Sequence, residues 1–315
     1  MKPRRARTWP IASRLSGLAA EWGTLAAGRV LAGTGAVFLQ VLMLKMVFDW
    51  FVGTRDLFLA TSLYIVGWPT GHALGQVLLT AAAQAGGWSW AFHAAGLACA
   101  AGLLALALGY APPAGAAARV QAPLSALSRR EFALVTIAGL LWMVVNGAYV
   151  VLLGFGPELL IERGAKPVAA AEAVGLMPAA FLVGIPLGAW LATRWRAGDL
   201  FIAGSLAAGT AVTWAILQGG GGVLFLALGL LLSLGVAPAA ALPSEALREE
   251  TRSAGLGWYF VWYFVGSAAL PPLAGALGDT TGTAETPVAF AAGAIAACIV
   301  LLTVFRLAQR ARAAA

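Results

Sequence analysis

The sequence predicts an all-α membrane protein, a polytopic helical bundle of about nine transmembrane helices. Hydrophobic residues make up 61% of the 315 residues and charged residues only 10%, whereas soluble domains carry about a quarter charged residues. So few charges could not cover the surface of a water-soluble fold. Only helices and closed barrels satisfy their backbone groups in lipid. Apolar runs such as 223–234 and 289–304 do not alternate in polarity as barrel strands do, so we expect helices.

Each predicted span is an apolar stretch of roughly the 20 residues that a helix needs to cross a hydrocarbon core about 30 Å thick. The predicted spans are 25–48, 57–84, 88–110, 131–160, 169–193, 199–218, 222–243, 255–278 and 286–307. They leave a basic N-terminal tail over 1–24, in which we expect no cleavable signal peptide.

Several chemistries are not expected from this sequence. Cys99 and Cys298 both fall inside predicted spans, where cysteine serves as a small packing residue. No CxxC, HExxH or paired-histidine spacing occurs, so we expect no metal site and no cofactor. Gly219–Gly222 is interpreted as a flexible turn, because no strand or P-loop lysine accompanies it. The net charge of +7 is better explained by membrane topology than by nucleic-acid binding.

The positive charges are biased toward one side of the membrane. Alternate connectors and the C-terminal tail hold Arg55, Arg119, Arg129, Arg130, Arg194, Arg196, Arg248, Arg252, Arg306, Arg310 and Arg312. The connectors on the other side hold only Arg163 and Lys166. Because cytoplasmic loops carry the excess of Lys and Arg, we expect a multi-pass protein of the cell (plasma or inner) membrane with a cytoplasmic C-terminus.

The N-terminal tail conflicts with this orientation. Its basic residues Lys2, Arg4, Arg5, Arg7 and Arg14 would lie outside, against the same rule. Three explanations stay open: the tail is translocated against its charge, the first span is frustrated, or an odd number of spans that should precede it is missing.

Glycine, proline and charged residues form a series of short motifs along the chain. The first predicted span begins Arg29-Val-Leu-Ala-Gly33-Thr-Gly35 and ends near Lys45-Met-Val-Phe-Asp49. The second carries Gly67-Trp-Pro-Thr-Gly71-His-Ala-Leu-Gly75. Later motifs are Gly188-Ala-Trp-Leu-Ala-Thr193-Arg194-Trp-Arg196, Pro238 with Pro243 and Glu245, Arg252-Ser-Ala-Gly255, and Pro271-Pro272 with Gly275 and Asp279-Thr-Thr-Gly282.

In order, spacing and sidedness these motifs resemble the major facilitator superfamily of secondary transporters, and the end of the first span resembles its cyanate and nitroimidazole subset. The resemblance covers about residue 25 to the C-terminus. It implies that the spans match the fourth to twelfth of a twelve-span fold, an incomplete fold without the first three spans. Thr193 stands where the family usually has Asp.

The same resemblance implies a domain division. Residues 25–110 would be the remnant of the N-terminal helical half, with three spans. Residues 111–130 would be a cytoplasmic linker, and 131–309 the C-terminal six-helix half. Such folds are built from inverted three-helix units, so a linker after the third span is what the loss of one unit would leave.

Two sets of residues have packing or charge roles as their simplest interpretation. Small residues let helix backbones approach closely, so helix packing is expected for Gly33, Gly35, Gly67, Gly71 and Gly75. A cytoplasmic charge network is expected for Lys45, Asp49, Arg194, Glu245 and Arg248. Lys45 and Asp49 are four residues apart and share a helix face.

Arg29 is a candidate for the translocation pathway. An arginine at mid-membrane costs about 2.5–3.5 kcal/mol on insertion scales, but Arg29 lies in the first turns of its span and can snorkel outward. The resemblance implies a role in proton transfer or substrate response. The sparse charge in the spans separately suits a small, weakly polar or monoanionic solute, for which Arg29 is a candidate counter-charge.

The remaining pathway candidates are polar and aromatic residues inside spans. Trp142, Asn146 and Tyr149 follow i, i+4, i+7 spacing and make one semi-polar stripe, which suits either a small polar or aromatic solute or hydrogen bonding between helices. Trp68 and His72 share a face of the second span, Gln40 lies in the first and His93 in the third. A histidine inside a span is a candidate proton relay.

Aromatic residues also open the eighth predicted span, at Trp258, Tyr259, Trp262 and Tyr263. We interpret them as an interfacial belt, with a substrate gate as the alternative.

Taken together, the residues predict a secondary transporter that moves a small solute by alternating access. The expected partners are the lipid bilayer and the solute. Transport coupled to protons is one option, and no nucleic-acid partner is expected. The alternative is an N-terminally truncated, transport-incompetent remnant. An enzyme is not expected, because no Ser/Lys, paired Asp or HExxH set occurs within the spans.

Overall fold

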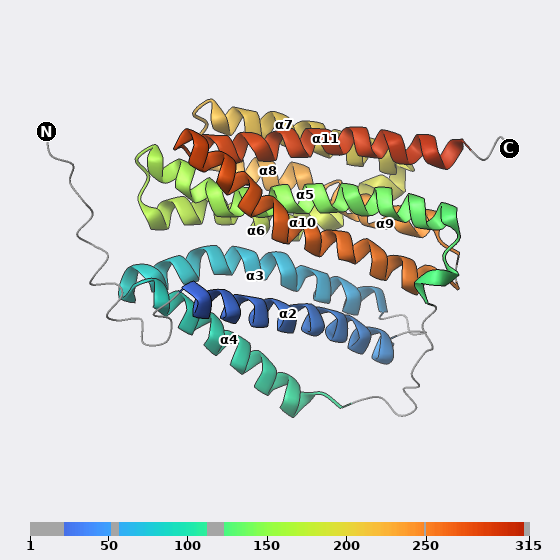
Figure 1. The fold of residues 1–315 in the computed structure, drawn as a ribbon, viewed down its shortest axis with the longest axis horizontal. Helices are drawn as coiled ribbons and strands as arrows, with labels where there is room; N and C mark the ends of the chain where they lie inside the picture. Colours follow the sequence, from blue (N-terminus) through green and yellow to red (C-terminus); the bar gives the residue numbers. More distant parts are fainter. Residues whose placement is uncertain (1–21, 52–56, 112–122, 249, 312–315) are drawn as a thin grey trace, which may run out of the picture. The chain divides into compact units, whose positions relative to one another are not determined.

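The computed structural model describes residues 22–51, 57–111, 123–248 and 250–311. Within those ranges the chain is helical and has no strand. The elements are α2 (Trp22–Phe51), α3 (Leu57–Gly86), α4 (Trp88–Gly109), the 3-10 turn η1 (Leu124–Ala126), α5 (Arg129–Glu162), α6 (Pro167–Trp195), α7 (Gly198–Leu217), α8 (Val223–Ser233), α9 (Val236–Ala246), α10 (Arg252–Thr281) and α11 (Glu285–Arg310) (Figure 1).

Seven candidate membrane spans are found among the described residues, in α4, α5, α6, α7, the α8–α9 pair, α10 and α11. This confirms the prediction of an all-α polytopic membrane protein. The first two predicted spans coincide with α2 and α3, which are each 30 residues long. Their crossing of the membrane stays a prediction.

The chain divides into two compact units. Unit 1 comprises residues 1–68 and 78–118, and unit 2 comprises 69–77 and 119–315. In unit 1 the indole N–H of Trp50, near the end of α2, donates to the carbonyl oxygen of Ala111 after α4, at 3.0 Å. Unit 2 contains α5 to α11 together with the segment Pro69–Val77 of α3.

The candidate spans of unit 2 alternate in direction and are joined by short connections, with α8 and α9 together forming one span. α5 packs against α10 and α11, α6 against α8, and α7 against α11; α7 and α11 lie side by side in Figure 1. One end of the unit therefore carries the N-termini of α5, α7 and α10 and the C-termini of α6, α9 and α11. We call this the basic end, because it holds Arg129, Arg130, Arg194, Arg196, Arg248, Arg252, Arg306 and Arg310.

Local sequence sets the helix ends. Ser128 and Glu131 form a reciprocal capping box at the start of α5, which satisfies two backbone N–H groups that the first turn leaves open. Pro167 occupies the first turn of α6, where its missing N–H costs nothing. Gly282 ends α10 at φ 72°, a left-handed conformation that glycine adopts without strain.

Glycines bring several helices of unit 2 into close contact. An added Cβ at Gly229 of α8 would clash with the carbonyl oxygen of Met177 in α6, and one at Gly188 of α6 with the backbone of Leu234. At Gly33, Gly35, Gly67 and Gly71 an added Cβ would meet no described atom within 4 Å. The packing role expected for these four and for Gly75 stays a prediction.

A buried carboxylate ties two connections together at the basic end. Glu131 is 4% exposed and accepts from the backbone N–H and Nε of Arg248 and from the hydroxyl of Thr251. Hydrogen bonding to Glu131 raises the pKa of the Arg248 guanidinium above its ordinary value. The start of α5 is thereby fixed to the α9–α10 connection.

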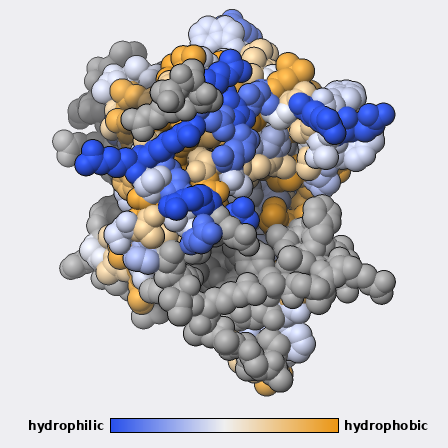
Figure 2. Space-filling model, turned by 90° about the vertical axis from the view of Figure 1, so that its right-hand side faces the viewer, coloured by the Kyte–Doolittle hydropathy of each residue, from blue (hydrophilic) through white to orange (hydrophobic). Residues whose placement is uncertain are grey.

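Arg306 of α11 forms a second network at the same end. Its guanidinium pairs with Asp199 of α7 and Glu245 of α9 and also donates to Gln309. Figure 2 faces this end and shows hydrophilic residues gathered over unit 2. Of the residues expected in a cytoplasmic charge network, Glu245 pairs with Arg306 and Arg248 pairs with Glu131.

Candidate functional site

The semi-polar stripe of α5 lies inside unit 2. Asn146 is 7% exposed and Tyr149 is 3% exposed. The amide nitrogen of Asn146 donates to the carbonyl oxygen of Trp142 at 2.8 Å. Asn146 and Tyr149 are thus both buried on one face of α5, as their spacing predicts for a helix.

Tyr149 joins this stripe to α3. Its hydroxyl lies 3.2 Å from Nδ1 of His72 in the segment Pro69–Val77, and which atom donates depends on the imidazole tautomer. The two ring centroids are 5.7 Å apart. On its other side the Tyr149 ring lies 5.2 Å from that of Phe181 in α6. Two residues proposed separately from sequence therefore form one contact.

A second hydrogen bond lies one turn further along both helices. The amide nitrogen of Gln76 donates to the carbonyl oxygen of Leu153 in α5 at 3.1 Å. The backbone at Gly175 of α6 comes close enough that an added Cβ would make ordinary contact with Gln76, Ala73 and Val77. The segment Pro69–Val77 thus rests on both α5 and α6.

Aromatic side chains of α10 complete the surroundings of the stripe. The Tyr259 ring is stacked on Trp142 at 5.8 Å between centroids, and the Trp262 ring lies over Gly139, where no Cβ would fit. Tyr259 is 2% exposed. An interfacial belt therefore does not describe Tyr259, which faces α5. The belt was expected because sequence shows only that aromatics gather near a span end.

Four buried polar atoms along the α5–α10 pair have no hydrogen-bond partner within the described parts of the chain. They are Nε1 of Trp142, the hydroxyl of Tyr259, Nε1 of Trp262 and Oγ of Ser267. A buried polar atom left unpaired costs about 1–3 kcal/mol. No sequence pattern singled out Ser267, although Tyr259, Tyr263 and Ser267 follow i, i+4, i+8 spacing on one helix face.

Formal charge is absent from the sequence around these atoms. Residues 132–157 of α5, 253–278 of α10 and 69–77 of α3 contain no Asp, Glu, Lys or Arg. The first charged residues along α5 are Glu131 and Glu158, toward its two ends. The arrangement can bind through hydrogen bonds and ring stacking, and offers no ion pair from these segments.

Other predicted site residues lie elsewhere. Trp68 and His93 belong to unit 1. Arg194 is exposed at the basic end. The side chains of Arg29, Gln40, Lys45 and Asp49 fall outside the described residues, so their predicted roles stay predictions.

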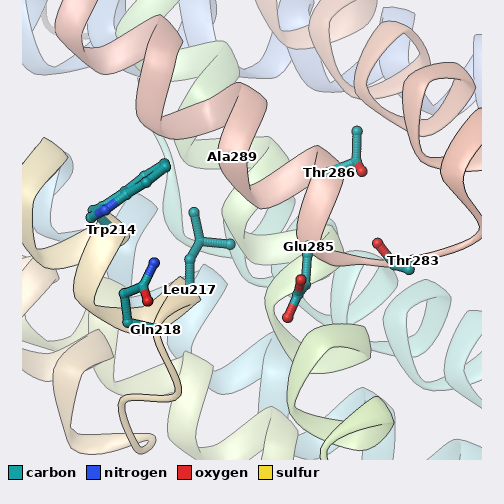
Figure 3. Close-up of a pocket in the computed structure, with 7 residues that line it drawn as sticks. All are labelled: Trp214, Leu217, Gln218, Thr283, Glu285, Thr286 and Ala289. Carbon is teal, nitrogen blue, oxygen red and sulfur yellow. The ribbon is translucent and has the colours of Figure 1, made fainter.

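Two surface pockets lie toward the ends of unit 2. One, of about 260 Å³, lies at the end opposite the basic end and is lined by Trp214, Leu217 and Gln218 on one side and by Thr283, Glu285, Thr286 and Ala289 on the other (Figure 3). The other, of about 290 Å³, lies at the basic end beside Thr193, Glu245 and Arg306. No group of three or more metal-ligating side chains occurs among the residues that the structure describes.

Comparison with known proteins gives one family. The model of the Major Facilitator Superfamily matches residues 8–236, well over half of the chain. A search of curated proteins found no match. The membrane-spanning helices and this match together show that the chain is a multi-pass membrane protein that belongs to the Major Facilitator Superfamily, a family of transporters.

Proposed function

We propose that the protein is a secondary transporter that moves a small solute across the membrane by alternating access. The observation that carries this is the uncharged site inside the bundle, where Tyr149 of α5 meets His72 of α3 beside Asn146 and Trp142. Buried polar groups inside a membrane domain are costly and mark substrate pathways. Sites of this kind lie near the bilayer midplane in secondary transporters.

The His72–Tyr149 contact suits a step that must open and close. It is one side-chain hydrogen bond between a short α3 segment and α5, and such bonds in membrane proteins contribute about 0.6 kcal/mol on average. A contact of that strength holds a closed state without locking it. Coupling to protons through the His72 imidazole is one form of the proposal, and exchange driven by the solute gradient alone is the other.

The basic end is proposed to face the cytoplasm. The C-terminus would then lie on the cytoplasmic side of a plasma or inner membrane. Among the described residues of unit 2, eight arginines gather there, and the opposite end has only Arg163 and Lys166. The guanidinium of Arg163 donates hydrogen bonds to the carbonyl oxygens of Ile216 and Leu217 and to the carboxylate of Glu285. This asymmetry follows the rule that Lys and Arg collect on the cytoplasmic side.

Uptake by purified protein tests the proposal. The chain is reconstituted in liposomes, a mixture of small neutral amides, monocarboxylates and amines is added outside, and the trapped solutes are identified by mass spectrometry. Protein-dependent uptake that falls at least tenfold in Asn146→Ala supports the site. The transport-incompetent alternative predicts no protein-dependent uptake by the wild type.

A further inference from the structure

Four buried polar atoms of α5 and α10 are unpaired within the part of the chain that the structure describes, and they share one chemical property. Two of them are indole N–H groups, of Trp142 and Trp262, which can only donate. The other two are hydroxyls, of Tyr259 and Ser267, which can rotate to donate. A hydrogen-bond acceptor is the one kind of group that could pair with all four.

The surrounding sequence limits the charge that a ligand with such an acceptor could carry. No Lys or Arg occurs within 132–157 of α5, 253–278 of α10, 286–305 of α11 or 69–77 of α3. An anion moved into this part of the bundle would lose its hydration with no cation from these helices to replace it. An ammonium group would bring further donors to a site already rich in them.

Ring surfaces complete the description. Trp142 is stacked on Tyr259, and Trp262 meets Trp258 edge to face, with centroids 5.7 Å apart. Aromatic side chains together with a few oriented polar groups are typical of the residues that bind ring-containing small molecules.

We propose that the solute is an uncharged, ring-containing molecule with a carbonyl-type acceptor, held by the indole N–H groups of Trp142 and Trp262. Tyr259 and Ser267 donate to further acceptors on the same molecule. This inference rests on the proposed transport function and adds the substrate class to it. The donors on α10 make that helix part of the specificity of the site.

Four phenyl compounds that differ in one substituent test the inference. Benzamide has a neutral acceptor, benzoate an anionic one, benzylamine a cationic donor, and toluene no polar group. Each is titrated into the full chain in nanodiscs with 15N-labelled tryptophan, and the indole N–H resonances are assigned with Trp142→Phe and Trp262→Phe. Benzamide is expected to move both resonances downfield, with weaker binding of the other three compounds.

Variants separate hydrogen bonding from shape. Trp142→Phe and Trp262→Phe keep an aromatic ring and lose the donor, so each is expected to weaken benzamide binding about tenfold, the equivalent of one hydrogen bond. Tyr259→Phe and Ser267→Ala provide two further donor deletions that do not touch tryptophan. Trp214→Phe, at the far pocket and 57% exposed, is the matched control and leaves binding unchanged.

Several results would overturn the inference. They are tighter binding of benzoate or benzylamine, equal binding of toluene, equal binding by the donor-deleted variants, or no response of either indole to benzamide in folded protein. If liposomes still show protein-dependent uptake of other solutes, the transport proposal stands and only the substrate class fails.

Discussion

Tyr149 shows what single residues contribute to this site and how far sequence could find them. Helical spacing alone placed Trp142, Asn146 and Tyr149 on one face, because period and burial are local properties. The contact with His72 was not predictable, because 77 residues separate the two and only tertiary packing brings them together. The same holds for Arg306, whose partners Asp199 and Glu245 come from two other helices.

The His72–Tyr149 bond is expected to show measurable coupling. In a double-mutant cycle of Tyr149→Phe and His72→Ala, we predict a coupling energy of about 0.6–1.7 kcal/mol, from the average to the maximum measured for side-chain hydrogen bonds between membrane helices. The measurement is reversible unfolding in mixed micelles. Tyr110→Phe, in unit 1, is the control for loss of a tyrosine hydroxyl. Strictly additive effects of the two substitutions would mean that the hydrogen bond contributes nothing.

Glu131 and Glu285 allow one substitution to be compared in two environments. Glu131→Gln removes the charge from a buried carboxylate that Arg248 and Thr251 both contact, so we predict a loss of about 1–3 kcal/mol in the free energy of unfolding. Glu285→Gln breaks an ion pair whose carboxylate side chain is 57% exposed, for which less than about 1 kcal/mol is expected. Unfolding midpoints of the two variants give the comparison, and equal losses would contradict it.

At the scale of elements, one predicted span is present as a single candidate membrane span that consists of two helices. The predicted span 222–243 is broken between α8 and α9 at Leu234 and Gly235. At Gly235 an added Cβ would clash with Ser205 of α7, so the break lies where another helix comes very close. Hydropathy finds the span because both halves are apolar, but it does not show where the helix is interrupted within it.

Glycine contacts between helices give a prediction with an internal control. Gly229→Ala places a methyl group against the carbonyl oxygen of Met177, so α6 and α8 must separate and we expect a loss of about 1–3 kcal/mol. Gly204→Ala lies in α7 with no atom within 4 Å and is expected to stabilise the helix by up to about 1 kcal/mol. Thermal unfolding of both variants in detergent measures the difference. A neutral Gly229→Ala would show that the two helices are not in close contact.

For the whole molecule, composition was sufficient to predict the class and insufficient to predict the site. Low charge and long apolar stretches fix a helical membrane protein because lipid leaves the backbone few alternatives. The charge asymmetry between connectors further predicts an orientation. Which helix faces meet cannot be inferred from hydropathy, because nearly every face is apolar, and so the role of α10 beside α5 emerged only from the structure.

Orientation can be tested with two single cysteines. In a Cys99→Ser background, where Cys298 is fully buried, Thr193→Cys is exposed at the basic end and Thr283→Cys at the opposite end. We predict that a membrane-impermeant maleimide labels Thr283→Cys in intact cells and Thr193→Cys only after permeabilisation. The reverse pattern would invert the proposed topology.

The central claim is that the site around Asn146 opens alternately to the two sides of the membrane, and cysteine access measures this most directly. Asn146→Cys in the Cys99→Ser background is reconstituted in liposomes, and an impermeant thiol reagent is added either outside or inside. The account predicts labelling from each side, with none at Ala148→Cys, which replaces a fully buried residue of α5 that precedes Tyr149 and lies off the face of the stripe. Labelling from one side alone, or from neither, would contradict alternating access at this site.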